Sequence, residues 1–233
     1  MIAALSKSAI LYLAPLLALT AVFLSLFSFL APVLMLRGRV SLLTVTPSTA
    51  LFSVQATDVD GPSVFLGALG SCARHTNSAG LFCTSPSVSP SYNLSVLPEN
   101  APALLLSPPA PSTPVLIAIA LSCSALFFIT FTLTSLKHEK VSAAMEKPLV
   151  QRMSAWIGVL GFMIGLTAFT VIRMWFGKSV QDFNSFIVSQ GNNGPKLIAS
   201  LGNGFTMIWV AYAFYAVPLI VALAKLNIKK SKA

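Results

Sequence analysis

The chain is poor in charged residues. Only 9% of its 233 residues are Asp, Glu, Lys or Arg, whereas 55% are hydrophobic. So few polar side chains could not cover the surface of an ordinary soluble globule. The composition therefore excludes a soluble protein and predicts a membrane protein.

Histidine and cysteine are also scarce, with two and three copies. His75 and His138 lie on either side of a long apolar segment, so we expect them on opposite faces of the membrane. In that arrangement they cannot combine in a zinc site or in a histidine-based nucleophile relay. The segment GNGF at Gly202 is not interpreted as a nucleotide-binding loop, because no strand is expected before it. We expect no enzymatic activity and no cofactor.

Four long apolar segments, at about 10–35, 115–136, 156–176 and 197–223, contain much of the hydrophobic composition. Each is long enough for a helix to cross a bilayer, which takes roughly 20 residues. Since lipid offers no partner for a free backbone N–H or C=O, all four are predicted to be helices. The first is too long for the apolar core of a cleaved signal peptide, so we interpret it as a signal anchor that stays in the protein.

Positive charge is distributed unevenly between the two sides of these helices. With both termini in the cytosol, the inner segments hold nine Lys and Arg against two Glu, and the outer segments hold six against four acidic residues. Cytosolic segments are enriched in Lys and Arg, so both termini are predicted to be cytoplasmic. Arg37 and Arg39, just after the first helix, oppose this pattern locally because they outnumber Lys7 before it. The overall basicity suits binding to anionic membrane lipids and does not imply a nucleic-acid partner.

This orientation places residues 36–113 in a long extracellular or lumenal loop and residues 177–196 in a short second one. The long loop contains Cys72 and Cys83, whereas Cys123 lies inside the second helix. In an oxidising compartment Cys72 and Cys83 are predicted to form a disulfide; the alternative is two free, buried thiols. Closing such a loop of ten intervening residues stabilises the fold by about 3 kcal/mol.

The long loop is rich in Val, Leu, Phe and Thr, which predicts three or four short strands with a turn near residues 77–80. A lone hairpin is marginal in water, so we expect the disulfide and docking on the helix ends to support it. Residues 98–114 contain six prolines and are predicted to form an extended strap leading to the second helix. The sequon Asn93-Leu94-Ser95 in the same loop predicts N-glycosylation of Asn93.

The segment GALGSCARHTNSAGLFC contains the motif Gly67-x-x-Gly70-x-Cys72, followed by Cys83. Together with four predicted spans and a long first outer loop, this motif resembles the claudin-like tetraspan superfamily. Within it, the motif is similar to that of a fungal family of mating-associated regulators of low-affinity calcium influx and membrane fusion. The resemblance implies one membrane domain over residues 1–233. Its fold would be a left-handed four-helix bundle with a small, disulfide-pinned β-sheet formed by the first extracellular loop.

Two related groups define the alternatives. Animal tight-junction claudins carry a Trp in this element, but the three tryptophans here, Trp156, Trp175 and Trp209, all lie outside the long loop. A paracellular barrier or pore is therefore not implied. A fungal group of cortical-patch and ambient-pH-sensing tetraspan proteins shares the layout and the paired cysteines. It implies an organiser of plasma-membrane domains, or a pH-signalling protein, as an alternative function.

Three glycines at helical spacing, Gly158, Gly161 and Gly165, form a smooth strip in the third predicted helix. Such strips let another helix approach closely. Packing within the bundle is favoured over dimerisation, because three neighbouring helices already need contacts.

The segment Asp58-x-Asp60-Gly61 is similar to the start of an EF-hand calcium loop. The other ligands of such a loop, including its terminal Glu, are missing. An ordinary Asp-Gly-Pro turn is favoured, and no metal site is predicted.

Polar residues within the predicted helices are few. Asn203, near the outer end of the fourth, is expected to hydrogen-bond across helices, and Pro218 is expected to kink its own helix. Arg173 lies close enough to the surface to snorkel beside Trp175. A permeation path usually carries buried ionisable groups, so a pore-forming or transporter subunit is the disfavoured alternative.

These features predict a non-enzymatic, multi-pass protein of the plasma membrane. Its outer loop would contact other membrane proteins, with a calcium channel as one candidate, or further copies of the same chain. The resemblance to the fungal family implies a role in calcium influx and membrane fusion during mating.

Overall fold

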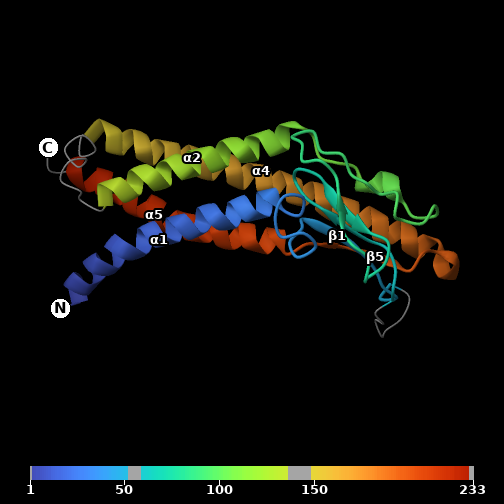
Figure 1. Ribbon diagram of the computed structural model, residues 1–233. Coiled ribbons are helices and arrows are strands. Elements are labelled where there is room, and N and C mark those ends of the chain that lie inside the picture. Colours follow the sequence, from blue (N-terminus) through green and yellow to red (C-terminus); the bar gives the residue numbers. More distant parts are fainter. Residues whose placement is uncertain (1, 52–58, 136–147, 231–233) are drawn as a thin grey trace. The chain divides into compact units, whose positions relative to one another are not determined.

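The computed structural model describes residues 2–51, 59–135 and 148–230 (Figure 1). Its long helices are α1 (Ile2–Leu30), α2 (Ser112–Ser135), α4 (Pro148–Ser189) and α5 (Gly204–Lys230), and its 3-10 turns are η1 (Ala103–Leu106) and η2 (Gly191–Asn193). The strands are β1 (Leu43–Pro47), β2 (Ser63–Leu66), β3 (Ser71–Arg74), β4 (Phe82–Cys83) and β5 (Leu197–Leu201).

Within these described ranges, four helical segments are long and apolar enough to cross a membrane. They are Tyr12–Leu30, Ser112–Ser135, Leu149–Ser189 and Gly204–Leu226. A helix satisfies all of its backbone hydrogen bonds internally, which is what a lipid environment requires. The predicted fold class is confirmed: a mostly helical membrane protein with four membrane-capable helices and a small sheet pinned by a disulfide.

The chain forms two compact units, and every described residue of the first is helical. Unit 1 comprises Met1–Leu26, Leu116–Thr167 and Ile208–Ala233. One cluster of buried side chains in its core comes from α1, α2 and α5: Ala14, Ala21, Phe127, Phe131, Tyr215 and Leu219. Phe127 and Tyr215 meet edge to face, with ring centroids 5.4 Å apart. Edge-to-face contacts of this kind favour a defined packing of helices over a loose apolar contact.

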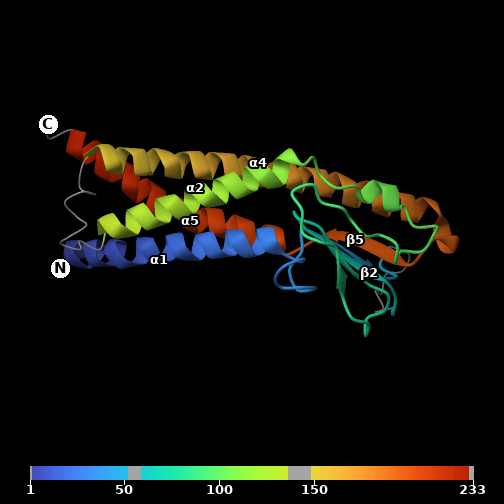
Figure 2. The same cartoon turned by 45° about the horizontal axis from the view of Figure 1, so that its top comes forward.

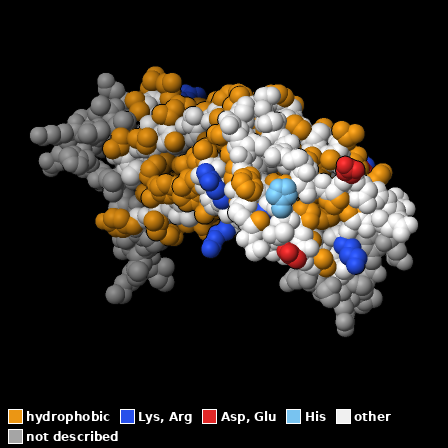
Figure 3. All heavy atoms as spheres, turned by 45° about the vertical axis from the view of Figure 1, so that its right-hand side comes forward, with side chains coloured by type: hydrophobic (Ala, Val, Ile, Leu, Met, Phe, Trp, Pro, Cys, Tyr) orange, Lys and Arg blue, Asp and Glu red, His pale blue; other side chains and the backbone are white. Residues whose placement is uncertain are grey.

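The outer surface of the helices is strongly apolar. Large side chains at least half exposed occur on α1, α2, α4 and α5, among them Tyr12, Leu126, Leu160 and Ile220. On the face drawn in Figure 3, hydrophobic side chains (orange) gather in large numbers and charged ones are sparse. A contiguous apolar exterior is unfavourable in water and favourable in lipid, so unit 1 is suited to the hydrocarbon core.

Unit 2 contains the sheet. It comprises Phe27–Val115 and Ala168–Met207. Its antiparallel strands lie in the order β4-β3-β2-β1-β5, and Figure 2 labels β2 and β5 of this sheet. Four strands come from the long predicted loop, as expected. The second half of α4 contributes fully buried side chains to this unit, among them Phe176, Phe183 and Ile187.

The predicted start of the fourth span, at residue 197, is wrong. Residues Leu197–Leu201 form β5, which pairs with all five residues of β1, and the helix begins at Gly204. Gly202 makes this change of direction: a Cβ there would collide with the Ser41 carbonyl oxygen, so only glycine fits. An apolar strand and the end of an apolar helix have the same hydropathy, and pairing with β1 decides between them. A strand therefore precedes GNGF, although as an antiparallel edge strand, unlike that of a nucleotide-binding loop.

The short second loop predicted at residues 177–196 is mostly helix. The third span was expected to end at residue 176, but α4 continues to Ser189. Polar residues lower the hydropathy after Phe176, yet Phe183 and Ile187 stay fully buried on one face. The spacing of seven residues from Phe176 to Phe183 and of four from Phe183 to Ile187 is typical of an amphipathic helix that packs one face on a protein core. Other ends differ too: α1 spans Ile2–Leu30 where 10–35 was expected, and α2 begins at Ser112 where 115 was expected.

Candidate interaction site at the disulfide-pinned sheet

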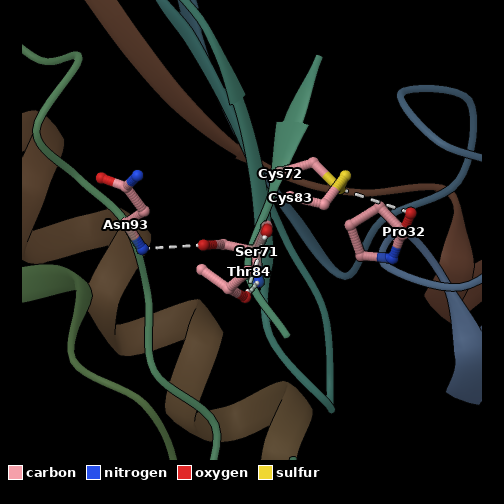
Figure 4. The surroundings of a disulfide bond; sticks show 6 residues. All are labelled: Pro32, Ser71, Cys72, Cys83, Thr84 and Asn93. Atoms are coloured by element: carbon pink, nitrogen blue, oxygen red, sulfur yellow. Dashed lines mark hydrogen bonds between the residues drawn. A yellow bond between two sulfur atoms is a disulfide. The ribbon is translucent and has the colours of Figure 1, made fainter. Parts of the chain in front are cut away.

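The predicted disulfide is present between Cys72 on β3 and Cys83 on β4. The two residues are direct partners across the strands, with Cα atoms 4.0 Å apart. Cys72 is fully buried, whereas Cys83 is half-buried. The Sγ of Cys72 lies 3.4 Å from the Pro32 carbonyl oxygen (Figure 4). A sulfur in a disulfide carries no hydrogen, so this is a packing contact. It places the disulfide against the first residues after α1.

The two motif glycines form the turn between β2 and β3. The Gly67 N–H donates to the Gly70 carbonyl oxygen at 2.9 Å. At Gly67 an added Cβ would lie 2.5 Å from Pro32 Cδ, and it would also collide with the Ala31 carbonyl oxygen. Gly70 has a φ of 154°, and an added Cβ there would collide with Thr84 Oγ1. Both positions therefore require glycine, one for close backbone approach and the other for conformation as well.

Side-chain hydrogen bonds connect this turn to the segment after β4 (Figure 4). Thr84 Oγ1 accepts from the Ser71 N–H at 3.0 Å, and Ser71 Oγ accepts from the Asn93 N–H at 2.8 Å. The Tyr92 hydroxyl donates to the Gly67 carbonyl oxygen at 2.8 Å. Burial raises the pKa of Tyr92 well above its ordinary value. The motif is thus the centre of a rigid network, and its residues act by shaping the sheet.

A second set of contacts fixes the turn after β3. Arg74 donates to the Asn77 carbonyl oxygen at 3.1 Å, and its guanidinium lies over the Phe65 ring, 5.7 Å from the centroid. The Asn77 N–H donates to Asp60 Oδ1 at 2.8 Å. The turn expected near residues 77–80 is therefore confirmed, and it is held from two sides. The Asp60 carboxylate thus accepts a hydrogen bond within this turn, and Asp58 lies outside the described residues.

The edge strand of the sheet, next to the disulfide, presents an exposed apolar side chain. β4 is an edge strand of the sheet, and Phe82 on it is 64% exposed. Leu104 is also exposed, at 93%, but it lies on the strap and is not part of the sheet. Large exposed apolar side chains on a rigid support are a common feature of contact surfaces, and edge strands accept further partners.

The three strip glycines of α4 face other helices of unit 1. A Cβ at Gly161 would lie 2.9 Å from Cys123 Cβ of α2, and one at Gly158 would lie 2.7 Å from Phe127 Cδ2. A Cβ at Gly165 would collide with the Tyr212 hydroxyl of α5. The space that a side chain would need at each position is filled by a residue from another helix of the same unit. The strip therefore serves packing within the chain.

Asn203 does not bond across helices as expected. It precedes α5, its Nδ2 donates to the Arg39 carbonyl oxygen at 2.9 Å, and its Oδ1 accepts from the Ser41 N–H at 3.4 Å. The reason is the late start of the helix, which leaves Asn203 at the junction with β5. Trp175 donates through its indole N–H to the Ser107 carbonyl oxygen at 3.1 Å, which ties the strap to α4.

His75 is exposed on unit 2, and His138 lies outside the described residues. Within the part of the chain that the structure describes, no group of three or more His, Cys, Asp and Glu side chains could hold a metal ion. The sequon asparagine, Asn93, is exposed, and its Oδ1 accepts from Ser95 Oγ at 2.6 Å.

Two residues that shape this unit were not found from the sequence. Tyr92 braces the glycine turn, and Asn184 of α4 bonds to the backbone of β5. The buried stripe on α4 was the available signal for Asn184, since an amide on that side of an extended helix needs a polar partner. No local pattern distinguishes Tyr92 from an exposed loop tyrosine.

No protein-family model matches this chain, and no curated protein is found to match it. The resemblance to the fungal family therefore stays a prediction that rests on the glycine and cysteine motif and on the layout of the spans.

Proposed function

We propose that this protein is a non-enzymatic regulator in the plasma membrane, with both termini in the cytoplasm, that supports calcium influx and membrane fusion during fungal mating. It acts through contacts of its outer sheet with other membrane proteins, including a calcium channel, or with further copies of itself. The observation that carries the proposal is the motif Gly67-x-x-Gly70-x-Cys72 built into a disulfide-pinned turn. That motif is the feature shared with the fungal family.

Two physical features support a binding role. The disulfide and the bonds around Gly67 hold the sheet rigid, so little conformational entropy is lost when it binds. Phe82 offers a large apolar contact at the edge of that sheet. Among the residues that the structure describes, no Lys, Arg, Asp or Glu side chain is buried, which favours a partner channel over conduction by this chain itself.

Calcium uptake in mating cells tests the proposal. Phe82→Ser is expected to lower the uptake while the amount of protein at the surface and its melting temperature stay unchanged. Leu104→Ser is the control, because this leucine is also large and apolar and is more exposed than Phe82, but it lies on the strap and not on the sheet. It should leave the uptake at the wild-type level.

Purified protein in liposomes supplies the opposing measurement. Calcium currents from the protein alone would contradict the proposed regulatory function and support a pore-forming subunit. Uptake that requires an endogenous channel in the cell supports the regulator.

Glycosylation of Asn93 belongs to the same proposal, because it requires the sheet to face the lumen during synthesis. Asn93 is exposed, so a transferase can reach it. Asn93→Gln should abolish a glycosidase-sensitive mass shift. A shift that persists in the variant would place the glycan elsewhere.

A further inference from the structure

The connection between α1 and β1 presents three consecutive apolar side chains on its surface. Leu34, Met35 and Leu36 are 49%, 43% and 39% exposed. Two exposed cations, Arg37 and Arg39, follow at once. We refer to residues 34–39 as the apolar-basic loop. Apolar side chains beside Lys or Arg are the combination that binds the interface between headgroups and acyl chains.

The loop is held in place by other parts of unit 2. The Arg39 N–H donates to the Leu36 carbonyl oxygen at 3.0 Å, and Asn203 Nδ2 donates to the Arg39 carbonyl oxygen at 2.9 Å. Gly38 packs against Leu81, where an added Cβ would lie 2.7 Å from Cδ1. The apolar side chains are therefore displayed by a fixed backbone.

Leu36 adopts a backbone conformation that leucine rarely takes. Its φ is 53°, the single positive value at a non-glycine residue among those the structure describes. A glycine or an asparagine would adopt this conformation with less strain. Strained residues of this kind concentrate at functional positions. The Leu36 side chain is 39% exposed. Burial within the chain therefore does not explain why a leucine occupies this strained position.

The loop begins where the first membrane span ends. The membrane-capable segment of α1 ends at Leu30. The Leu34 N–H donates to the Leu30 carbonyl oxygen at 3.0 Å, so the loop continues directly from the last helical turn. Its side chains follow the end of the hydrocarbon region by only a few residues.

An aromatic residue marks the same level on α4. Ser28 near the end of α1 donates to the Gly204 carbonyl oxygen at 3.0 Å, and the neighbouring Phe205 meets Phe176 of α4 with ring centroids 6.5 Å apart. Next to Phe176 lies Trp175, which is 45% exposed. Tryptophan is enriched where membrane and water meet. Through these contacts within unit 2, the end of α1 and Trp175 lie at a similar level along the helix axes.

We infer that the apolar-basic loop inserts into the headgroup region of the phospholipid leaflet on the side of the sheet. Leu34, Met35 and Leu36 contact the upper acyl chains, and Arg37 and Arg39 bind lipid phosphates. A guanidinium donates two parallel hydrogen bonds to phosphate oxygens, which suits this partner. The two arginines that oppose the charge pattern of the first helix thus serve lipid binding. This inference does not rest on the proposed function, because it holds for whichever leaflet the sheet faces.

A fluorescent label at the loop tests the inference in the full-length protein. Met35→Cys is made in a Cys123→Ala background, which leaves the Cys72–Cys83 disulfide intact, and labelled with an environment-sensitive dye. The protein is placed in phosphatidylcholine nanodiscs with and without lipid that carries a doxyl quencher at acyl carbon 5. We expect blue-shifted emission and quenching at position 35. A label at Ser89→Cys, an exposed site of the same unit, should show neither.

Equal emission and quenching at positions 35 and 89 would overturn the inference. So would a blue shift that appears in detergent and grows with protein concentration, because it would assign the loop to contact between copies. Arg37→Gln with Arg39→Gln should reduce the quenching at position 35 without changing the melting temperature. Leu36→Asn should reduce it too, while relieving the backbone strain, so a loss of lipid contact is separated from misfolding.

Discussion

One side chain of α4 satisfies both backbone groups of Ala199 on β5. Asn184 Nδ2 donates to the Ala199 carbonyl oxygen at 2.9 Å, and the Ala199 N–H donates to Asn184 Oδ1 at 2.8 Å. β5 is the last strand of the sheet and Ala199 is buried. An edge strand with unpaired groups is a site for unwanted pairing. Asn184 therefore covers this edge at Ala199.

Asn184→Ala should therefore destabilise the protein. It leaves a buried N–H and a buried carbonyl oxygen without a partner, at a cost of about 1–3 kcal/mol. Thermal unfolding in detergent measures the effect. Gln181→Ala, an exposed position on the same helix, is the control and should have almost no effect. Equal melting temperatures for the two variants would show that water replaces the amide at little cost.

The disulfide should give two cysteine variants of different reactivity. Cys72→Ser frees the half-buried Cys83, which an impermeant maleimide should label on intact cells. Cys83→Ser frees Cys72, which is fully buried and should react much more slowly. Both variants lose about 3 kcal/mol of stability.

A double variant without either cysteine is the blank for this labelling. If Cys83 stays unlabelled in Cys72→Ser on intact cells, the sheet does not face the outside.

Substitutions at two glycines of α4, one inside the strip and one outside it, should change the stability in opposite directions. Gly161→Leu forces a side chain against Cys123, whose Cβ would lie 2.9 Å from the new Cβ, and overpacking of this kind costs about 1–3 kcal/mol or more. Gly177→Ala has nothing within 4 Å of its new Cβ and should add about 0.5–1 kcal/mol through helix propensity. Melting curves in detergent compare the two. An unchanged curve for Gly161→Leu would refute close packing of α4 and α2.

Gly165 and Tyr212 should be energetically coupled. A methyl group at position 165 meets the Tyr212 hydroxyl, so Gly165→Ala alone is expected to destabilise unit 1. Tyr212→Phe removes the hydroxyl and should restore part of the loss. A double-mutant cycle measures the coupling, which for residues in contact is about 0.5–3 kcal/mol. Additive effects of the two changes would mean that the ring moves aside freely.

Tyr92 makes stability depend on alkaline pH. Burial raises its pKa above the ordinary value of about 10, so above that pH the unfolded chain loses this proton before the folded protein does. The free energy of unfolding should then fall as the pH rises beyond about 10. In Tyr92→Phe this part of the fall should disappear. The same variant loses the hydrogen bond to Gly67, which should cost about 1 kcal/mol at neutral pH.

Comparing unfolding of wild type and Tyr92→Phe between pH 8 and about 11 isolates that contribution, because other groups titrate equally in both. Parallel curves across this range would contradict the buried, protonated state of Tyr92.

Local composition was sufficient for the features that depend on one segment. Long apolar runs predicted the four membrane-capable helices, because the cost of placing a residue in lipid depends mainly on its own side chain. The pairing of Cys72 with Cys83 followed from their place in one long loop on the oxidising side and from the position of Cys123 in a span. The four strands of the long loop followed from β-favouring residues between turn signals.

Tertiary structure decided whatever depends on two distant segments. Residues 197–201 are apolar enough for helix or strand, and they become β5 because β1 offers a free edge 156 residues earlier, at Thr44 opposite Ser200. The second half of α4 is too polar to be identified as a span, and it stays helical because Phe183 and Ile187 are buried in unit 2. Hydrogen-bond partners and buried faces are properties of pairs of segments, whereas hydropathy is a property of one. For that reason the sequence alone determined the membrane helices and the disulfide, and only the fold determined the fifth strand, the long α4 and the exposure of the apolar side chains at residues 34–36.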